Sequence, residues 1–482
     1  MSSPLYQVAT LRAAEAAAQA ELPAGELMLR AGRATAAHLA RDARPGSWCI
    51  VCGPGNNGGD GYVVAAELQA RGHQVTCVQP AGARPTAADA RAAFDRWTAG
   101  GGPVVDTLPP SGQFTGVIDA LFGIGLARPL TGAWLATADW INHHAAIALD
   151  VPSGLDADTG AWVGGVPGVR ATATITFIGD KPGLHTGDGV DAAGHVHVEA
   201  LDVNAGAGDA ELTSREDLAP LLRPRQRNSH KGTYGNVGVI GGGRGMVGAA
   251  LLAARAALRM GAGRVYASLI GAPEFTVDPL QPELMFRAPQ ELETLQALVV
   301  GCGLGTDGAA RGVLAHALAQ DVALVIDADA LNLLATDAWL RAALRQRGAP
   351  AIITPHPLEA ARLLGGSAAD VQRDRLAAAR LLAQHSGGVA LLKGAGTVIA
   401  DANGRVAVNS TGSPALATAG SGDVLAGMLG ALLAQGLSAW DAAVTGAWLH
   451  GAAADAEDRG LVAGDIAPRA MQVLQRLRAS EA

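Results

Sequence analysis

Short apolar runs alternate with helical segments along almost the whole chain, and this alternation limits the possible folds more than any other feature. In the first half the runs include "SWCIVCG", "GVIDALFG", "AAIALDVPSG" and "TATITFIG", with a helix expected over residues 61–71. Each run is continuously apolar, as in strands that are buried on both faces. Strands of this kind separated by helices predict a parallel sheet that is covered by helices on each side.

A second series of the same kind follows a change in texture. Residues 204–232 are rich in glycine, proline and charge and show no periodic strand, which indicates a linker. After it come the runs "NVGVIGGG", "ALVVGCG", "VALVIDAD", "AIITPHP" and "VALLKG". A chain of 482 residues is also too long for one ordinary core. We therefore predict two tandem α/β domains, over residues 1–207 and 233–482, joined by a linker and entry segment at 208–232.

Charge and hydropathy exclude several classes of partner. The net charge is −8, and lysine and arginine form no runs, so neither nucleic acid nor an anionic membrane surface is expected as a partner. No apolar run reaches the roughly 18 residues that span a bilayer. The N-terminus lacks the pattern of a signal peptide, and we expect a cytoplasmic protein.

Four cysteines are too few for a disulfide framework and are typical of a reducing compartment. Two of them, Cys49 and Cys52, form a C-x-x-C pair. A redox pair of this spacing normally opens a helix, whereas this one lies in the apolar run "WCIVCG". We interpret the pair as buried strand residues, with a redox motif as the alternative.

Three polar loops of the first half follow predicted strands. They read "GPGNNGGDG" (53–61), "DALFGIGLARPLTG" (119–132) and "LDVPSGLDADTG" (149–160). In open parallel sheets, ligands bind at the carboxyl ends of the strands. The glycines of the first loop suit a phosphate cradle at a helix N-terminus, but the loop lacks the lysine of a Walker loop and the G-x-G-x-x-G register of a dinucleotide fold. A plain tight turn is the alternative for that loop taken alone.

In the second half, the segment "AGSGD" (419–423) opens an apolar helix. The N–H groups in the first turn of such a helix form an anion site. A carboxylate at Asp423 is badly placed to bind phosphate but well placed to take a proton from an attacking hydroxyl, which is the base role of a phosphoryl transferase. The alternative is an N-cap aspartate, and the flanking small residues Gly420 to Gly422 favour the base.

Taken together, "GPGNNGGDG", "DALFGIGL", "LDVPSGLDADTG" and the early "LMLRAG" resemble the N-terminal domain of the NAD(P)H-hydrate epimerases, over roughly residues 5–205. The resemblance implies a Rossmann-like three-layer α/β/α domain, a hydrated nicotinamide cofactor as ligand, and a potassium ion. The family's potassium positions match Asn57, Asp119 and Ser153, which offer amide, carboxylate and hydroxyl oxygens. Its substrate-binding positions match Asn56, Asn57, Gly58, Gly59, Asp60, Gly123, Ile124, Gly125, Leu126, Ala127, Arg128, Pro129 and Asp150.

Epimerisation at the hydrated ring carbon needs proton movement to or from the hydroxyl and stabilisation of a charged ring intermediate. We predict Asp150 as the acid/base, with Lys181 of "GDKPGLHTG" as its helper. Asp60 is expected to be a polar anchor for the ligand. The alternatives are that Asp119 and Asp150 each cap a turn at a strand end, and that Lys181 is a solvated loop lysine.

The ordered pieces "HKGTYGNVGVIGG", "GCGLG", "DADALN", "TPHPLEAARLLG", "LLKGAGTV" and "AGSGD" are similar to the ADP-dependent NAD(P)H-hydrate dehydratases, over roughly residues 215–480. The resemblance implies a ribokinase-like α/β domain in which ADP phosphorylates the hydroxyl of the hydrate and phosphate then leaves. Positions that face the hydrate match Ala249, Gly303, His356 and Asp423. Positions that face the adenine nucleotide match Lys393, Gly394, Ala395, Gly396, Thr397 and Gly422. A packed turn histidine is the alternative for His356.

These patterns predict an enzyme of nicotinamide-cofactor repair. One domain interconverts the R and S forms of hydrated NADH and NADPH, and the other dehydrates the S form with ADP and magnesium, giving NAD(P)H, AMP and phosphate. A small-molecule kinase of the same superfamily is one alternative, and a first domain that senses a ligand without catalysis is another. We expect small-molecule substrates and a homo-oligomer.

Overall fold

The computed structural model of the chain describes residues 3–40, 46–82, 84–110, 112–222, 224–455 and 459–481. The chain divides into two compact units: Pro4–Ala210 forms one, and Glu211–Ala482 with Met1–Ser3 forms the other. Two short strands, β1 (Ser3–Leu5) and β9 (Ala210–Leu212), fall at this division of the sequence. The predicted α/β class is confirmed, whereas the limits of the predicted functional domains stay predictions.

The described residues of the N-terminal unit form a sheet of seven strands in the order β4-β3-β2-β5-β6-β7-β8, and every neighbouring pair is parallel. Its strands are β2 (Ser47–Cys52), β3 (Gln74–Val78), β4 (Val104–Val105), β5 (Gly116–Ala120), β6 (Ala146–Leu149), β7 (Ala173–Phe177) and β8 (His195–Glu199). Its helices are α1 (Val8–Glu21), α2 (Glu26–Leu39), α3 (Asn56–Ala70), α4 (Ala88–Ala99), α5 (Ala133–Ile141) and α6 (Gly189–Ala192).

Strand β2 shows why this sheet is covered on both faces. Its side chains alternate between two cores: Trp48, Ile50 and Cys52 pack with α2, α3 and α4, whereas Cys49 and Val51 pack on the other face with α5. The two cysteines of the C-x-x-C pair are therefore buried on opposite faces of a strand as free thiols. The predicted buried strand is confirmed.

The helix expected over residues 61–71 begins earlier, at Asn56. The expected loop "NNGGDG" is therefore the first part of α3, and its glycines serve close packing. A side chain at Gly58 would overlap the carbonyl of Gly53, and a Cβ at Gly59 would lie 2.5 Å from Cε of Met28. Packing against β2 and α2 thus overrides the low helix propensity of glycine.

The C-terminal unit contains a mixed sheet in which the order from β9 is β9-β18-β17-β16-β15-β14-β13-β10-β11-β12. The strands after β9 are β10 (Asn236–Gly241), β11 (Arg264–Leu269), β12 (Met285–Phe286), β13 (Ala297–Val300), β14 (Ala323–Ile326), β15 (Ala351–Ile353), β16 (Val389–Leu392), β17 (Val398–Asp401) and β18 (Val406–Val408). Strands β10 to β16 pair in parallel, and β17 is antiparallel to both of its neighbours.

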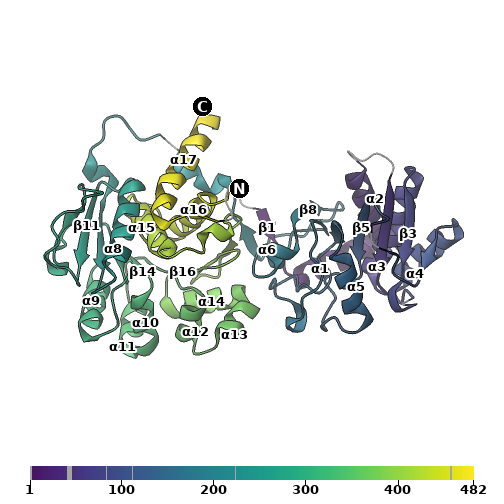
Figure 1. Ribbon diagram of the computed structural model, residues 1–482, viewed down its shortest axis with the longest axis horizontal. Coiled ribbons are helices and arrows are strands. Elements are labelled where there is room, and N and C mark those ends of the chain that lie inside the picture. The colour runs from purple at the N-terminus through teal and green to yellow at the C-terminus, as the bar shows by residue number, and fades with distance from the viewer. Residues whose placement is uncertain are drawn as a thin grey trace. The chain divides into compact units, whose positions relative to one another are not determined.

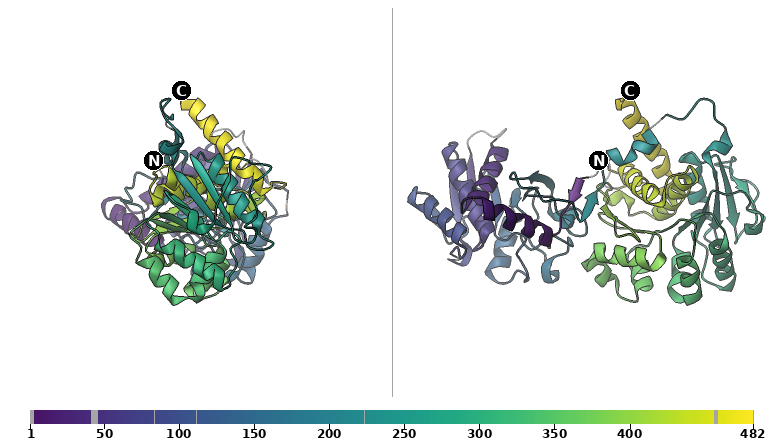
Figure 2. Two further views of the ribbon diagram at one scale, coloured as in Figure 1. Left: turned by 90° about the vertical axis from the view of Figure 1, so that its left-hand side faces the viewer. Right: turned by 180° about the vertical axis from the view of Figure 1, so that it is seen from behind.

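Helices cover both faces of this second sheet (Figure 1). The helices α8 (Val247–Arg259), α15 (Ser421–Ala434), α16 (Ala439–Ala452) and α17 (Ala463–Glu481) lie on one side, where they share a core with the strands. The other side carries α9 (Gly308–Ala319), α10 (Asp329–Thr336), α11 (Ala338–Arg345), α12 (Pro357–Leu364), α13 (Ala368–Arg373) and α14 (Arg375–Ser386). The view from behind in Figure 2 shows the same two layers.

The segment expected as a strand-free linker, residues 208–232, contains regular structure. The strand β9 pairs in parallel with β18, and a short helix, α7 (Ala219–Leu222), follows it. Three residues, Ala-Glu-Leu, are too few to show a period in sequence, so the strand depends on its partner. Within the described residues, no helix combines the length and apolar character needed to cross a bilayer.

Candidate active sites

A cavity of about 770 Å³ opens at the carboxyl ends of the strands in the N-terminal unit. Several residues predicted to bind substrate line it: Asn56, Asn57, Asp60, Gly123, Ile124, Gly125, Leu126 and Asp150. Lys181 lines it as well. The cavity therefore brings together residues from the starts of α3 and of the loops after β5, β6 and β7, as the strand-end rule predicts.

Other predicted binding residues do not line this cavity. Gly58 and Gly59 are buried against the Gly53 carbonyl and Met28, as described above. The residues Ala127, Arg128 and Pro129 are exposed. Leu126 is the last residue of this loop that lines the cavity. For these five positions the structure gives no direct contact with a ligand in the cavity.

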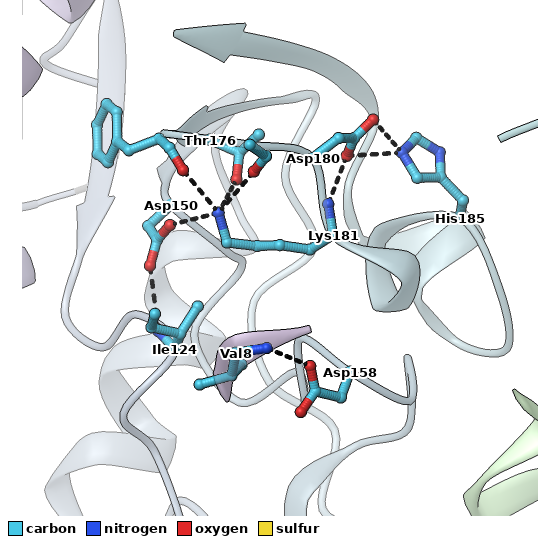
Figure 3. Close-up of polar contacts among 10 residues, drawn as sticks. Val8, Ile124, Asp150, Asp158, Thr176, Asp180, Lys181 and His185 are labelled. Atoms are coloured by element: carbon cyan, nitrogen blue, oxygen red, sulfur yellow. Dashed lines mark hydrogen bonds and ion pairs between the residues drawn. The ribbon is translucent and has the colours of Figure 1, made fainter. Parts of the chain in front are cut away.

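An ion pair between Asp150 and Lys181 lies in the cavity wall (Figure 3). The Lys181 ammonium is 3.0 Å from Oδ1 of Asp150, and the lysine side chain is only 1% exposed. It also donates to Oγ1 of Thr176 at 2.6 Å and lies 3.1 Å from the carbonyl oxygens of Phe177 and Gly179. The alternative of a solvated loop lysine is wrong, because the ammonium is enclosed by four oxygens.

The second oxygen of Asp150 accepts a hydrogen bond from the backbone N–H of Ile124 at 3.1 Å. The residue itself has a φ of 68°, in the left-handed region that aspartate adopts only with some strain. The carboxylate is thus held by an ammonium on one side and by the loop after β5 on the other. A plain turn cap would need neither the buried lysine nor the cavity.

Two of the three predicted potassium ligands, Asp119 and Ser153, contact each other, and the third, Asn57, lines the cavity. Oδ1 of Asp119 accepts from the hydroxyl of Ser153 at 2.7 Å, and its Oδ2 accepts from the Ser153 backbone N–H at 2.8 Å. Burial raises the pKa of Asp119 to about 6 in spite of these bonds. Asn57 is buried, and neither its amide oxygen nor its amide nitrogen has a hydrogen-bond partner among the described residues. A buried amide that makes no hydrogen bond within the protein is costly, so its oxygen is available to a ligand such as a cation.

Two further carboxyl groups face the same cavity. Asp60 lies on α3, and burial followed by the nearby charges of Asp150 and Glu15 holds its pKa well above the usual range. Glu15 lies on α1, and burial and then Asp150 raise its pKa. The approach of α1 to this site was not predicted, because an alanine-rich helix does not indicate what it packs against.

In the C-terminal unit, Asp423 lies in the first turn of α15. The N-cap of this helix is Gly420, with a φ of 87°, so the alternative of an N-cap aspartate is wrong. Burial, and then the charge of Asp327, raise the pKa of Asp423 to about 6. The thiol sulfur of Cys302 and one carboxylate oxygen each of Asp327 and Asp423 lie within 4.8 Å of one another. The helix start therefore carries a carboxyl group with a raised proton affinity, which suits a general base.

Lys393 lies beside this group but pairs with a different carboxylate. Its ammonium is 2.7 Å from Oδ1 of Asp327, and a Cβ added at Gly422 would lie 3.2 Å from the same nitrogen. Burial opposes the charge, but Asp327 and then Glu359 raise the pKa of Lys393. A fixed cation next to the N-terminus of α15 makes this end of the helix a stronger anion site.

His356 caps the start of α12. Its Nδ1 accepts a hydrogen bond from the backbone N–H of Leu358 at 3.1 Å. The backbone N–H of His356 in turn donates to the carboxylate of Glu359 at 2.8 Å. The imidazole side chain is 46% exposed, so the alternative of a packed turn histidine does not describe it. Burial raises the pKa of Glu359 to about 7. The cap leaves Nε2 as the ring nitrogen that carries a proton in the neutral form.

The remaining predicted residues lie around the same helix start. A Cβ at Gly303 would lie 3.2 Å from Cβ of Ala249, and Gly303 follows Cys302 of the Asp423 cluster. The turn from Lys393 to Thr397 is held by Arg375, which is fully buried and donates to the carbonyls of Leu392 and Lys393. The residues predicted to face the hydrate and those predicted to face the nucleotide thus lie at the same end of one sheet.

Four side chains at this site were missed from the sequence: Cys302, Asp327, Glu359 and His450. The first three belong to quoted segments that follow β13, β14 and β15, so the strand-end rule would have found them. His450 lies on α16, where Nε2 is 3.0 Å from the carbonyl oxygen of Ser421 and burial lowers its pKa to about 4. No local pattern marks a histidine that contacts a residue 29 positions away.

Comparisons with known proteins agree with this arrangement. The family model described as "YjeF-related protein N-terminus" matches residues 24–183, and the one described as "NAD(P)H-hydrate dehydratase" matches residues 237–476. The chain is 40% identical to the "bifunctional NAD(P)H-hydrate repair enzyme Nnr" of Escherichia coli (strain K12), over 94% of this chain and 89% of that protein.

Two more relatives match the C-terminal unit. The "ADP-dependent (S)-NAD(P)H-hydrate dehydratase" of Neisseria meningitidis serogroup B is 46% identical over 54% of this chain and 92% of that protein. A crystal structure of an ADP/ATP-dependent NAD(P)H-hydrate dehydratase from Bacillus subtilis, co-crystallised with ATP and Mg²⁺, is 32% identical over 52% of this chain and 93% of that one, with a TM-score of 0.48.

The fold and the two sites define a two-domain α/β enzyme that acts on small molecules. Since the relationship to the E. coli enzyme extends over nearly the full length of both chains, the family is established. The chain belongs to the bifunctional NAD(P)H-hydrate repair enzymes.

Proposed function

We propose that the two units catalyse consecutive steps in the repair of hydrated nicotinamide cofactors. The N-terminal unit epimerises the R and S forms of hydrated NADH or NADPH, and the C-terminal unit dehydrates the S form at the expense of ADP. Family membership supports the two activities. The observation that carries the residue assignments is the placement of Asp423, a carboxyl group of raised pKa, within the first turn of α15.

In the N-terminal unit, Asp150 accepts and returns the proton of the ring hydroxyl. Its free surface faces the cavity, while Lys181 and the N–H of Ile124 fix its orientation. We assign Lys181 as a positioning residue rather than a proton carrier, because its three N–H bonds are already directed at four oxygens. Asp60 anchors the polar part of the dihydronicotinamide.

A potassium ion fits the oxygen donors that Asn57, Asp119 and Ser153 offer. The amide oxygen of Asn57 is buried and makes no hydrogen bond with any described residue. Burial raises the pKa of Asp119, and a monovalent cation there would neutralise the charge of its carboxylate. These three residues would hold the ion, and its charge would stabilise the loops that carry the cavity wall.

In the C-terminal unit, Asp423 takes the proton of the hydrate's hydroxyl as that oxygen attacks the terminal phosphoryl group of ADP. The N–H groups at the start of α15 and the ammonium of Lys393 receive the negative charge of the phosphoryl group. Phosphate is a far better leaving group than hydroxide, so its departure, with loss of a proton from the adjacent ring carbon, restores the dihydronicotinamide. Magnesium would supply charge neutralisation to the nucleotide, and Asp327, in the group with Cys302 and Asp423, offers a carboxylate oxygen to hold it.

A coupled assay tests this assignment. A mixture of R and S hydrates of NADH is incubated with the full chain, ADP and magnesium, and NADH is followed by its absorbance while AMP and phosphate are measured by chromatography. We expect one AMP and one phosphate for each NADH. A stable phosphate ester without NADH would identify a small-molecule kinase instead. Location in the cytoplasm and assembly into a homo-oligomer stay predictions.

A further inference from the structure

The first long helix supplies one wall of the N-terminal cavity. Four residues of α1 line it, namely Leu11, Arg12, Glu15 and Gln19. Their spacing places them along one side of a helix of 3.6 residues per turn. The guanidinium of Arg12 lies near the loop after β5, since a Cβ added at Gly125 would be 3.8 Å from Nη2 of Arg12. That loop contains residues predicted to bind the substrate.

The start of α1 is fixed by the loops that build the site. The backbone N–H of Val8 donates to Oδ1 of Asp158 at 2.7 Å (Figure 3), and that of Gln7 donates to Oδ2 of Asp209 at 2.8 Å. The N–H of Tyr6 donates to the carbonyl of Asp180 at 2.8 Å, and Asp180 directly precedes Lys181. These bonds hold α1, and with it Arg12, in register with the Asp150–Lys181 pair.

The charges around the cavity are unbalanced toward the acidic side. Among the described residues, five carboxyl groups line it, from Glu15, Glu26, Asp60, Asp89 and Asp150, against two cations, Arg12 and Lys181. The ammonium of Lys181 is enclosed by its four oxygen partners. No hydrogen bond or ion pair engages the guanidinium of Arg12 among the described residues, and the side chain is exposed. A dinucleotide brings at least two phosphate charges into this surrounding.

We propose that Arg12 binds a phosphate group of the hydrated dinucleotide at the mouth of the cavity. A guanidinium is the side-chain group best suited to bidentate phosphate binding. Arg12 is the lining cation that no described residue engages in a hydrogen bond or ion pair. The proposal rests on the epimerase function proposed above. The phosphate is either in the pyrophosphate shared by both hydrates or the 2′-phosphate that only the hydrate of NADPH carries.

Steady-state epimerisation by the full chain tests the proposal. Pure R hydrate is supplied without ADP, so that dehydration does not proceed, and the appearance of the S hydrate is measured by chromatography above the spontaneous rate. For Arg12→Ala we expect KM to rise about tenfold, the effect of losing one charge-assisted hydrogen bond, with kcat changed by less than about threefold. Arg12→Lys should recover part of the lost affinity, because the charge remains.

The two hydrates separate the two phosphate sources. An equal rise in KM for both identifies the pyrophosphate, whereas a rise confined to the hydrate of NADPH identifies the 2′-phosphate. The matched control is Arg33→Ala on α2, which removes an arginine that pairs with Glu67 outside the cavity lining. Unchanged KM for both hydrates in Arg12→Ala would overturn the proposal, as would an equal change in the control. A wild-type chain that does not epimerise would instead overturn the proposed function.

Discussion

Each unit places a lysine–aspartate pair beside its site, and the two pairs differ in which carboxylate they include. In the N-terminal unit, Lys181 pairs with Asp150, the proposed acid/base itself. In the C-terminal unit, Lys393 pairs with Asp327, while the proposed base, Asp423, lies next to that pair and has its pKa raised to about 6 by burial and by Asp327.

The difference matches the two reactions. Reversible proton exchange on a ring hydroxyl needs a carboxylate in a fixed position, and a buried ammonium with four oxygen partners holds it there. Phosphoryl transfer needs a base that accepts a proton close to neutral pH, and a cation nearby that receives charge from the phosphate. In the N-terminal site, the lysine therefore acts as a clamp that holds the aspartate in position. In the C-terminal site the roles are separate: Asp423 is the base, and Lys393 is the cation that receives charge from the phosphate.

The largest expected effect is the loss of the base in the C-terminal unit. Asp423→Asn removes the proton acceptor without changing the size of the side chain, and kcat for dehydration of the S hydrate should fall about a thousandfold, within the range for general bases. NADH absorbance in the presence of ADP measures it. Epimerisation of the R hydrate should be unchanged, and dehydration that persists within tenfold of the wild-type rate would remove Asp423 as the base.

Removing the clamp in the N-terminal unit should have the next largest effect. Lys181→Met leaves Asp150 without its cation inside the cavity wall, which is a costly arrangement, and we expect epimerisation to fall about a hundredfold. In Lys181→Ala, methylammonium should restore part of the rate, because the shortened side chain leaves space for an ammonium among the four oxygens. Lys231→Met, on an exposed lysine, is the control. If methylammonium rescues neither the epimerisation rate nor the stability, the enclosed ammonium does not act as a clamp.

The pKa of Asp423 also predicts how dehydration depends on pH. The base must be ionised, so kcat/KM for the S hydrate should fall about tenfold per pH unit below about pH 6 as Asp423 takes up a proton. Initial rates between pH 5 and pH 9, with the S hydrate supplied directly, give the profile. A rate that is constant down to pH 5 contradicts the assignment of this pKa to the base.

A smaller effect concerns stability and the proposed potassium site. Burial raises the folded-state pKa of Asp119 to about 6 from an unfolded value of 3.8, so its contribution to stability is full below pH 3.8 and is lost as the pH rises through 6. A cation beside the ionised group should offset this loss. Potassium chloride should therefore raise the melting temperature of the N-terminal unit by a few degrees at pH 8.

Two controls accompany that measurement. The rise should be much smaller at pH 5, where Asp119 is protonated, and N-methylglucamine chloride at equal ionic strength should not reproduce it. Asp119→Asn should abolish the dependence on potassium. An equal response of this variant and the wild type would place any potassium effect elsewhere in the chain.

The sequence allowed the two α/β series and most of the strand-end residues to be predicted, for a physical reason. Continuous apolar strands can be recognised locally, and parallel strands bring their carboxyl ends to one edge, so polar loops after "GVIDALFG" and "AAIALDVPSG" had to meet. Helix-start chemistry already indicated an anion site and a base at "AGSGD", and family resemblance was needed to assign the substrates. The resemblance did not separate residues of the cavity wall from the exposed Ala127 to Pro129.

Contacts between distant segments lay beyond local patterns. The pairing of Lys393 with Asp327 joins residues 66 positions apart, and nothing near either residue specifies it. The early start of α3 was missed because the glycines that argue against a helix are required by its close packing. The approach of α1 to the cavity depends on bonds to Asp158 and Asp209, which are more than 100 residues away.

A time course from pure R hydrate of NADH, with ADP and magnesium, tests most directly that two separate sites act in sequence. The wild type should form NADH, Asp150→Asn should form it only at the rate of spontaneous epimerisation, and Asp423→Asn should accumulate S hydrate without NADH. Equimolar Asp150→Asn and Asp423→Asn together should restore NADH formation. Wild-type rates for Asp150→Asn on the R hydrate, or NADH from Asp423→Asn alone, would contradict this account.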